Sequence, residues 1–274
     1  MMNQLRKAIR TVLILLRNLR VPMPLFLIDR VDTWKAYAAS SRISKKVFDG
    51  RRIRKVDDTR WELHPMPSES ELSSFYSTTY WAGRGSTFCL VNERDLSQYS
   101  NITKVFSELL TTGTPKRFLN FGSGHGGVSY LALMRGFEVI NVDPFLSSEQ
   151  RFTAVVDLDQ VVEQVDFIYA SHSLEHVADL PSTLQKIDRL LAANGYLFVE
   201  VPNTMYPHYS VEGINGSRSP IVQVPHTQYF SIEFFRTLGY DIISLCTYRY
   251  EGDRFGVEMS SNEGEVIRFL GKKA

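Results

Sequence analysis

From Lys116 onward the sequence alternates short apolar runs with stretches of helical periodicity, and this alternation restricts the fold more than any other feature. The apolar runs are RFLNF, EVINV, TAVV, VDFIYAS and YLFVEV, and helical patterns lie at residues 128–135 and 180–193. Strands separated by helices at this spacing form right-handed βαβ crossovers. The sequence therefore predicts a doubly wound α/β domain whose parallel sheet is covered on both faces.

The rest of the chain adds helices before this region and strands after it. Ser68 and Glu71 have the spacing of a capping box, which predicts a short helix ending before Gly83. A second helix is expected from about Ile102 to Thr112. The C-terminal runs DIISLCTYRY, RFGVEM and EVIRFL predict antiparallel strands that complete one edge of the sheet.

Charge is divided unevenly along the chain. Residues 1–60 contain 15 Lys and Arg against 5 Asp and Glu, whereas the remaining residues contain 16 against 25. The beginning of the chain, MMNQLRKAIRTVLILLRNLRVP, has the pattern of a basic amphipathic helix. Its longest apolar run, VLILL, is far shorter than the ~20 residues of a spanning helix. We expect three regions: a basic arm (1–60), a helical cap (61–115) and the α/β domain (116–274).

The basic arm leaves several partners open. Residues 1–20 are expected either to contact an anionic inner membrane face or to pack on the body of the protein or on a second subunit, and a transit peptide is a less favoured alternative. Nucleic acid is not expected, because the aromatic residues of the arm are not interleaved with its charges. The two cysteines, Cys89 and Cys246, form neither a disulfide framework nor a metal pair, which favours a reducing, cytoplasmic setting.

A glycine cluster follows the first strand of the α/β region, in FLNFGSGHGGVS. Its spacing fits both the G-x-G-x-x-G loop of dinucleotide sites and the G-x-G-x-G loop of S-adenosylmethionine sites, and a tight turn without a ligand is the bland alternative. Asp143 ends the second strand about twenty residues further on, where a carboxylate binds ribose hydroxyls. Some 115 residues precede the first strand, unlike most dinucleotide folds, and Asp157 follows the third strand, where it suits an adenine amino group.

Residues 116–245 resemble the class I S-adenosylmethionine-dependent methyltransferases, in the small-molecule branch associated with bacterial cell-surface glycans. The resemblance is carried by the runs SLEHV, GYLFVEVPN and HTQYFSIEFFRTLGY in combination. It implies a Rossmann-like, seven-stranded sheet with an antiparallel last strand, S-adenosyl-L-methionine as cofactor and a link to polysaccharide biosynthesis. The residues that it implies for the cofactor are Gly122, Ser123 and Gly124 at the methionine moiety, Asp143 with Pro144 at the ribose, Asp157 and Leu158 at the adenine, and Ser171 and His172 near the sulfonium.

One position departs from the family pattern. Asn120 stands two residues before the first glycine, where the family usually has an acid. The amide still donates and accepts hydrogen bonds, so we retain Asn120 as a cofactor-binding residue with reduced affinity for the cationic methionine end. The departure keeps a catalytically degenerate binding protein as an alternative to the enzyme. An NAD-dependent oxidoreductase is the other alternative, although the sequence offers no catalytic set for it.

His172, Glu175 and His176 spell the H-x-x-E-H motif of certain zinc proteases. His172 follows the strand VDFIYAS directly, so the two histidines are not expected on one helix face, and we expect no metal. Glu175 and His176 are expected to begin the following helix and to shape the wall of the pocket.

His226, in VPHTQYFS, is the candidate general base, because an imidazole with a pKa near neutrality suits proton abstraction from an acceptor. Packing against the following helix is the alternative role for this side chain. The long segment before His226 predicts a substrate-specific lid. The candidate substrate-binding residues are Tyr80, Trp81, His208 and Tyr229.

Together these features predict a methyltransferase that acts on a small molecule, a glycan or a nucleotide sugar. O- or N-transfer is favoured over C-transfer, because the cysteine-rich zinc module of sugar C-methyltransferases is not found in the sequence.

Overall fold

The computed structural model describes residues 51–77, 91–144, 153–206, 226–251, 254–259 and 264–274. Residues 1–50, with the expected amphipathic helix, lie outside the described residues. Among the helices that are described, none is both long and apolar enough to cross a membrane.

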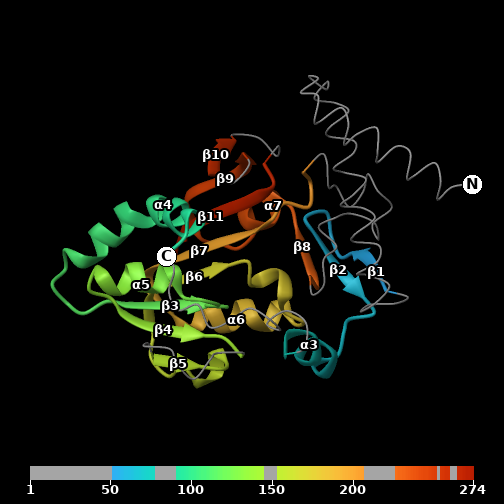
Figure 1. Ribbon diagram of the computed structural model, residues 1–274, viewed down its shortest axis with the longest axis horizontal. Coiled ribbons are helices and arrows are strands. Elements are labelled where there is room, and N and C mark those ends of the chain that lie inside the picture. The colour runs from blue at the N-terminus through green and yellow to red at the C-terminus, as the bar shows by residue number, and fades with distance from the viewer. Residues whose placement is uncertain (1–50, 78–90, 145–152, 207–225, 252–253, 260–263) are drawn as a thin grey trace, which may run out of the picture.

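The core of the molecule is a mixed sheet with the order β10-β9-β11-β7-β6-β3-β4-β5 (Figure 1). Its strands are β3 (Arg117–Phe121), β4 (Glu138–Val142), β5 (Thr153–Val155), β6 (Val165–Ser171), β7 (Leu191–Pro202), β9 (Asp241–Glu251), β10 (Arg254–Met259) and β11 (Val266–Lys272). Strands β3 to β7 pair in parallel, whereas β11 lies antiparallel between β7 and β9. The predicted sheet with an antiparallel last strand is confirmed, and β10 adds an eighth strand at the edge of the described sheet.

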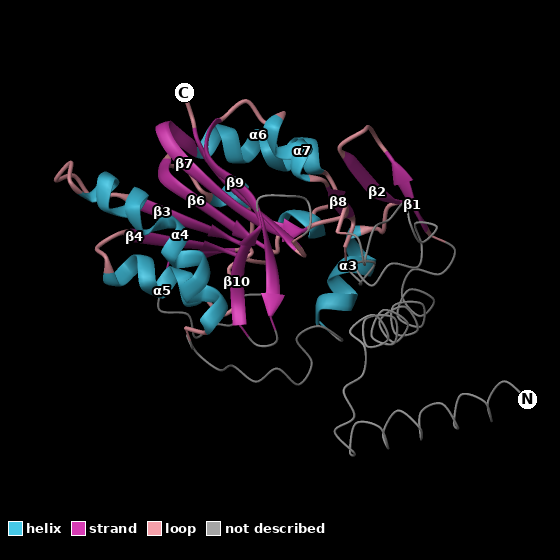
Figure 2. Cartoon of the chain, turned by 90° about the horizontal axis from the view of Figure 1, so that it is seen from above, coloured by secondary structure: helices cyan, strands magenta, loops and turns pink. Residues whose placement is uncertain are grey.

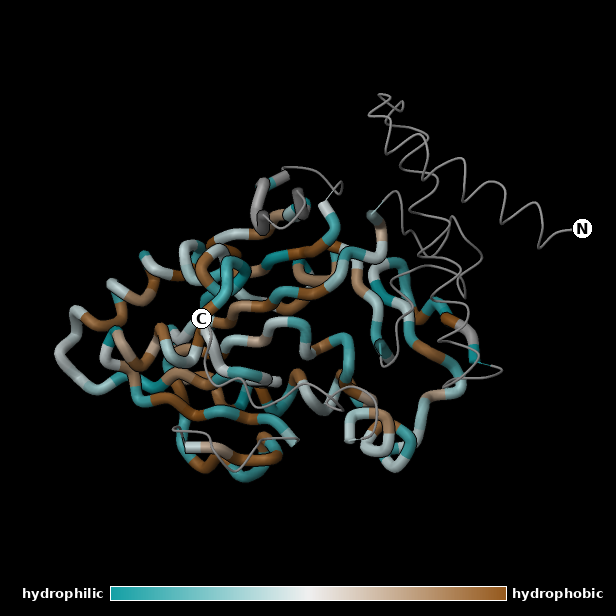
Figure 3. The backbone as a smooth tube through the Cα atoms, viewed as in Figure 1, coloured by the Kyte–Doolittle hydropathy of each residue, from teal (hydrophilic) through white to brown (hydrophobic). Residues whose placement is uncertain are grey.

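Helices cover both faces of this sheet and make three layers (Figure 2). Helices α4 (Glu93–Leu110) and α5 (Gly127–Met134) lie on one face, and α6 (Leu180–Leu190) and α7 (Ile232–Arg236) lie on the other. Successive strand residues point to opposite faces, so Phe118 packs under α4 and α5 while Leu119 packs under α6 and α7. In Figure 3 the hydrophobic stretches recur along the central strands, as burial on both faces requires.

The two helices before the sheet begin at capping boxes. The short helix predicted at Ser68 is confirmed as α3 (Glu69–Phe75), with Ser68 and Glu71 capping each other reciprocally. Helix α4 begins nine residues before the predicted Ile102, because Asn92 and Asp95 form a second capping box. The sequence prediction missed this start, because the capping box here is made by Asn and Asp in place of the usual Ser or Thr and Glu.

A second, three-stranded sheet with the order β1-β2-β8 lies beside the large one. Its strands are β1 (Arg52–Lys55), β2 (Arg60–His64) and β8 (Gln228–Phe230). The predicted helical cap therefore also contains a strand. Buried side chains from β2, α3 and β8 form one hydrophobic cluster, which contains Trp61, Leu63, Leu72, Phe75 and Tyr229. This cluster fixes α3 and the residues around β8 beside the carboxyl ends of the large sheet's parallel strands.

Candidate functional site

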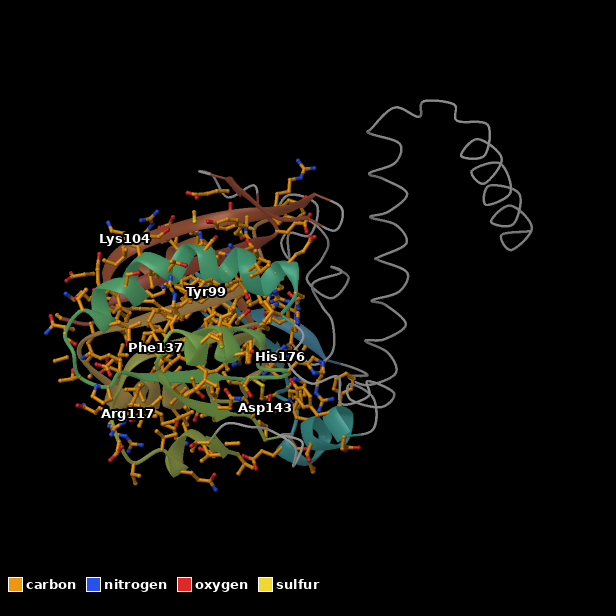
Figure 4. The ribbon with its side chains drawn as sticks, turned by 60° about the vertical axis from the view of Figure 1, so that its left-hand side comes forward. Tyr99, Lys104, Arg117, Phe137, Asp143 and His176 are labelled. Atoms are coloured by element: carbon orange, nitrogen blue, oxygen red, sulfur yellow. The ribbon has the colours of Figure 1, made fainter. Side chains whose placement is uncertain are left out.

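A cavity of about 820 Å³ opens at the carboxyl ends of β3, β4 and β6, between α3 and the first turn of α4. In Figure 4, Asp143 and His176 lie at the carboxyl ends of the parallel strands, whereas Arg117, at the start of β3, lies at the opposite ends of these strands. The volume suits a ligand of cofactor size, and this edge of an open α/β sheet is where ligands bind.

The glycine loop forms the floor of the cavity. Gly122, Gly124 and Gly126 all have positive φ, at 71°, 50° and 72°, a conformation that side chains with a Cβ adopt only under strain. A Cβ on Gly122 would lie 2.2 Å from Ser173 Oγ, so this position also lacks space for a side chain. Gly126 is the N-cap residue of α5, and the backbone N–H groups at this helix start suit an anionic ligand group.

Ser123 and Asp143 present polar atoms beside this loop. Ser123 is 7% exposed, and its Oγ has no hydrogen-bond partner among the residues that the structure describes. Asp143 is also buried and lies directly after β4, where its Oδ2 accepts a hydrogen bond from the Gly124 N–H at 2.9 Å. Both residues line the cavity. An orphaned hydroxyl facing a cavity is a polar atom that a bound ligand would satisfy.

The remaining residues expected at the cofactor also line the cavity. Pro144 follows Asp143, and Asp157 and Leu158 lie after β5, at the start of a short 3₁₀ helix, η2 (Leu158–Gln160). Ser171 ends β6, and its Oγ accepts a hydrogen bond from Gln98 Nε2 at 2.7 Å. The structure thus brings together residues from four separate strand ends.

His172 has an unusual backbone and two acidic neighbours. Its φ is +50°, a conformation that non-glycine residues hold only where the surroundings impose it and that clusters at functional sites. Its Nδ1 lies 3.0 Å from Glu175 Oε1, and its Nε2 lies 3.2 Å from Glu200 Oε1. The imidazole therefore bridges two carboxylates at the rim of the cavity.

Asn120 is engaged by its own neighbours. It is 3% exposed, and its Nδ2 donates a hydrogen bond to Ser129 Oγ at 2.8 Å. Ser129 Oγ in turn donates to Asn141 Oδ1 at 2.7 Å. A carboxylate at residue 120 could not donate to this hydroxyl. The hydrogen-bond chain explains why an amide suits this position, and it ties the amide of Asn120 to α5.

Asp95 is a carboxylate of the cavity that the sequence prediction missed. It stands in the first turn of α4, lines the cavity, and lies so close to the start of α5 that a Cβ on Gly127 would be 2.2 Å from its Oδ2. Desolvation by burial raises the pKa of the Asp95 carboxyl above its ordinary value. The capping-box pair Asn92 and Asp95 in the sequence VNERD was the signal that would have identified the helix start and, with it, this residue.

Glu200 anchors α4 to the sheet underneath the site. It is fully buried in β7 and accepts hydrogen bonds from Arg268 Nε at 2.5 Å, Gln98 Nε2 at 2.6 Å and Arg94 Nε at 3.2 Å. Arg268 stands directly opposite Glu200 in the β7–β11 register. The signal in the sequence was a single charge inside each of two apolar strands, YLFVEV and VIRFL.

His226 lies beside Glu175 and His176. The ring centroids of His176 and His226 are 4.9 Å apart, and His176 lines the cavity. Glu175 and His176 belong to a 3₁₀ turn, η3 (Leu174–His176), while His172 precedes it, so the two histidines of the H-x-x-E-H motif do not share a helix face. We refer to Glu175, His176 and His226 as the His–Glu cluster.

The candidate substrate residues have different outcomes. Tyr80, Trp81 and His208 lie outside the described residues, as does most of the expected lid. Tyr229 is 2% exposed and packs in the cluster around Trp61, where its hydroxyl donates to the His226 carbonyl at 2.9 Å. Burial raises the pKa of the Tyr229 phenol. Tyr229 thus supports the backbone of His226 and is not among the residues lining the cavity.

The chain matches a protein-family model and is similar to several solved structures. A family model described as a methyltransferase domain matches residues 91–245. Among solved structures, the chain is similar to a 1,6-didemethyltoxoflavin-N1-methyltransferase of Burkholderia thailandensis, with 13% identity, coverage of 81% of this chain and 99% of that one, and a TM-score of 0.47.

Two further solved structures are similar to this chain at lower TM-scores. A magnesium protoporphyrin IX methyltransferase of Synechocystis PCC 6803, with bound S-adenosylhomocysteine, shares 14% identity over 74% of this chain and 98% of that one, with a TM-score of 0.46. The N-methyltransferase NodS of Bradyrhizobium japonicum WM9 shares 11% identity over 62% and 86%, with a TM-score of 0.41. No match was found among curated proteins.

Proposed function

Because this chain belongs to the methyltransferase-domain family, we propose that it uses S-adenosylmethionine as its cofactor and methylates an oxygen or nitrogen of a small molecule, a glycan or a nucleotide sugar in the cavity described above. The observation that carries the proposal is the convergence on one cavity of the glycine loop, the carboxylate of Asp143 and the orphaned hydroxyl of Ser123. These three features match the three needs of the cofactor: close backbone approach, ribose binding and hydrogen bonding to its amino-acid end.

The proposed contacts follow the order of the strands. Gly122, Ser123 and Gly124 hold the methionine moiety, and Asp143, with Pro144 packed next to it, accepts hydrogen bonds from the ribose hydroxyls. Asp157 and Leu158 hold the adenine, while Ser171 and His172 lie near the sulfonium. The proposal is supported by the presence of all of these residues on the wall of one cavity.

We assign the α-ammonium group of the cofactor to Asp95. Asn120, at the position where the family has an acid, donates its amide hydrogen to Ser129 and carries no charge. Asp95 lines the same cavity, lies close to Gly127 at the end of the glycine loop, and supplies a carboxylate of raised pKa in a partly desolvated place. A charge-assisted hydrogen bond is stronger there than in water.

Methyl transfer needs position and orientation more than protein-borne reactivity. The bound cofactor supplies a methyl group on a positively charged sulfur. The cavity supplies alignment of an acceptor for in-line displacement. His226 is proposed as the residue that acts on the acceptor hydroxyl or amine, because its ring lies next to the ring of His176, which lines the cavity.

Features of the sequence support the proposed acceptor class. The resemblance to the branch associated with cell-surface glycans favours an acceptor of polysaccharide biosynthesis, and the basic first sixty residues favour an anionic partner or surface. The scarcity of cysteine favours a cytoplasmic setting.

Calorimetric titration of the purified chain with S-adenosylmethionine, S-adenosylhomocysteine and NAD tests the cofactor assignment at this cavity. We expect the first two to bind and NAD not to bind. Asp143→Ala should abolish binding by removing the ribose acceptor, with Asp188→Ala, a surface aspartate away from the cavity, as control. Binding of NAD alone would contradict the proposal, and equal binding by the two variants would move the site elsewhere.

A further inference from the structure

The His–Glu cluster contains three side chains that the proposed cofactor contacts leave unused. One potential ligand atom from each of Glu175, His176 and His226 lies within 4.8 Å of those from the other two. His176 Nε2 is 3.8 Å from Glu175 Oε1. Two ligands that are each about 2.1 Å from one metal ion lie about 3–4 Å apart, so small side-chain rotations would complete the set.

Glu175 is the strongest indication of a missing partner. Its side chain is 1% exposed, and neither carboxylate oxygen accepts a hydrogen bond from any residue that the structure describes. A buried carboxylate needs hydrogen bonds, an ion pair or a metal to offset the loss of its hydration. The imidazole nitrogens of His172 and His176 lie near Oε1 but leave both oxygens without a donor of proper geometry.

Hydrogen bonds of the backbone hold the three side chains close together, although His226 is distant in sequence from Glu175 and His176. Thr227, next to His226, donates its N–H to the Glu175 carbonyl at 2.7 Å and its hydroxyl to the Val177 carbonyl at 2.7 Å. Leu63 of β2 donates its N–H to the Thr227 carbonyl at 2.9 Å from the other side. The hydrogen bonds of Thr227 therefore place His226 beside Glu175.

We propose that Glu175, His176 and His226 bind a divalent first-row transition-metal ion at the edge of the cofactor cavity. Two imidazoles and one carboxylate are the donor set of Zn²⁺, Fe²⁺, Co²⁺ and Mn²⁺ sites, whereas Mg²⁺ and Ca²⁺ prefer oxygen ligands alone. Three protein ligands leave further coordination positions open. This site differs from the H-x-x-E-H arrangement considered in the sequence, because His226 takes the place of His172.

His172 lies between the carboxylate of Glu175 and that of Glu200, where it can orient the Glu175 side chain. Its ring spans the gap between Glu175 and the buried Glu200, in a backbone conformation held at positive φ. On metal binding, a hydrogen bond from His172 Nδ1, which lies 3.0 Å from Glu175 Oε1, would fix the orientation of the carboxylate and strengthen metal binding. His172 is therefore a positioning residue for this site, in addition to its place near the cofactor.

The open positions of the ion face the cavity, since His176 is part of the cavity wall. Resting on the proposed function, the ion would bind the acceptor's hydroxyl oxygen and lower the pKa of that hydroxyl, so that its proton passes to solvent as the oxygen takes the methyl group. His226 would then act on the acceptor through the ion, and not as a free base.

Titration of the chelator-treated full chain with Co²⁺ tests the site, because visible d–d absorption of Co²⁺ reports nitrogen and oxygen ligands without any turnover. The titration is made first without cofactor and then with S-adenosylhomocysteine. The variants of the cluster are the near-isosteric Glu175→Gln, His176→Ala and His226→Ala, and His172→Ala tests the positioning residue. His64→Ala, which removes a histidine of β2 outside the cluster, is the control, and circular dichroism checks that each variant is folded.

We expect saturable binding of a single Co²⁺ ion, displaced by Zn²⁺, in the natural protein and in His64→Ala. Binding should weaken more than ~100-fold in the three cluster variants and about 10–100-fold in His172→Ala. Absence of a saturable signal in the folded natural protein, or equal binding by Glu175→Gln, would overturn the metal site. Failure of S-adenosylhomocysteine to bind would instead contradict the proposed function, and the cofactor-free titration would still test the metal site.

Discussion

At the scale of single residues, the site is defined by a few residues that present a polar group to the cavity or form a tight backbone turn beside it. Ser123 has a hydroxyl without a hydrogen-bond partner among the described residues, Gly122 has no room for a Cβ against Ser173, and Asp95 has a carboxylate at the cavity. The first two lie in the glycine motif and were predictable from the sequence. Asp95 was not predictable, because the sequence alone indicates only a capping role for a carboxylate at the start of a helix. Its position at the cavity follows from the packing of this helix against the glycine loop.

Asp95→Asn is expected to weaken S-adenosylhomocysteine binding by about 10–100-fold, the value of a charge-assisted hydrogen bond of ~1.5–3 kcal/mol. Its amide oxygen can still cap Asn92, so the helix start should be kept. 5′-Methylthioadenosine, which has no amino-acid moiety, should bind both proteins equally in the same calorimetric experiment. Equal losses for the two ligands would show that Asp95 shapes the pocket and does not bind the ammonium group.

The raised pKa of Asp95 gives this contact a pH dependence of known sign. Burial moves the pKa upward from 3.8, so the carboxylate is lost at a higher pH than in the unfolded chain. Affinity for S-adenosylhomocysteine should therefore fall as the pH falls through this raised value, and the fall should be smaller in Asp95→Asn. At neutral pH the Asp95 carboxyl is charged, and its burial then destabilises the folded state. Without cofactor, Asp95→Asn should therefore unfold at a temperature no lower than that of the natural protein.

Gly122→Ala should abolish cofactor binding and lower stability by more than strain alone. Gly113 provides the matched control, because its φ of +72° nearly equals the +71° of Gly122 but no atom lies within 4 Å of its missing Cβ. Gly113→Ala should cost about 1–2 kcal/mol of unfolding free energy for the left-handed conformation. Urea denaturation of the two variants separates this strain from the collision with Ser173, and equal costs would contradict the steric account.

At the scale of elements, the parallel strands and their helices were predictable, because the spacing of apolar residues and the length of each apolar run distinguish strands from helices. The start of α4 and the sheet of β1, β2 and β8 were not predicted. A three-residue strand such as β8 has no periodicity of its own and exists through pairing with β2, which is some 165 residues earlier in the chain. That pairing positions His226, so the local geometry of the acceptor side lay beyond sequence patterns.

The buried pair of Glu200 and Arg268 fixes α4, and with it Asp95, on the sheet. Arg268→Met should cost about 3–5 kcal/mol of unfolding free energy, because it leaves the fully buried Glu200 with less compensation. Arg236→Met, which removes the exposed pair with Glu233, should cost at most about 1 kcal/mol in the same urea titration. Adding Glu200→Leu to Arg268→Met should recover part of the loss, and no recovery would argue against an uncompensated charge.

At the scale of the whole molecule, the site is assembled from segments far apart in sequence. The glycine loop and Asp143 come from the sheet, Asp95 comes from the helix before it, and His226 is brought in by the second sheet. The sequence motif predicted the first group, while the other two depend on long-range packing. The residues proposed to bind the cofactor can therefore be predicted largely from local sequence patterns, whereas those on the acceptor side can be identified only from the fold.

A crystal structure of the full chain with S-adenosylhomocysteine would test the central claim most directly. The account predicts the ribose on Asp143, the adenine beside Asp157 and Leu158, and the α-ammonium group within hydrogen-bond distance of Asp95. A cofactor bound in this cavity with its ammonium group turned away from Asp95 would contradict that assignment. A cofactor bound elsewhere, with the glycine loop empty, would contradict the account as a whole.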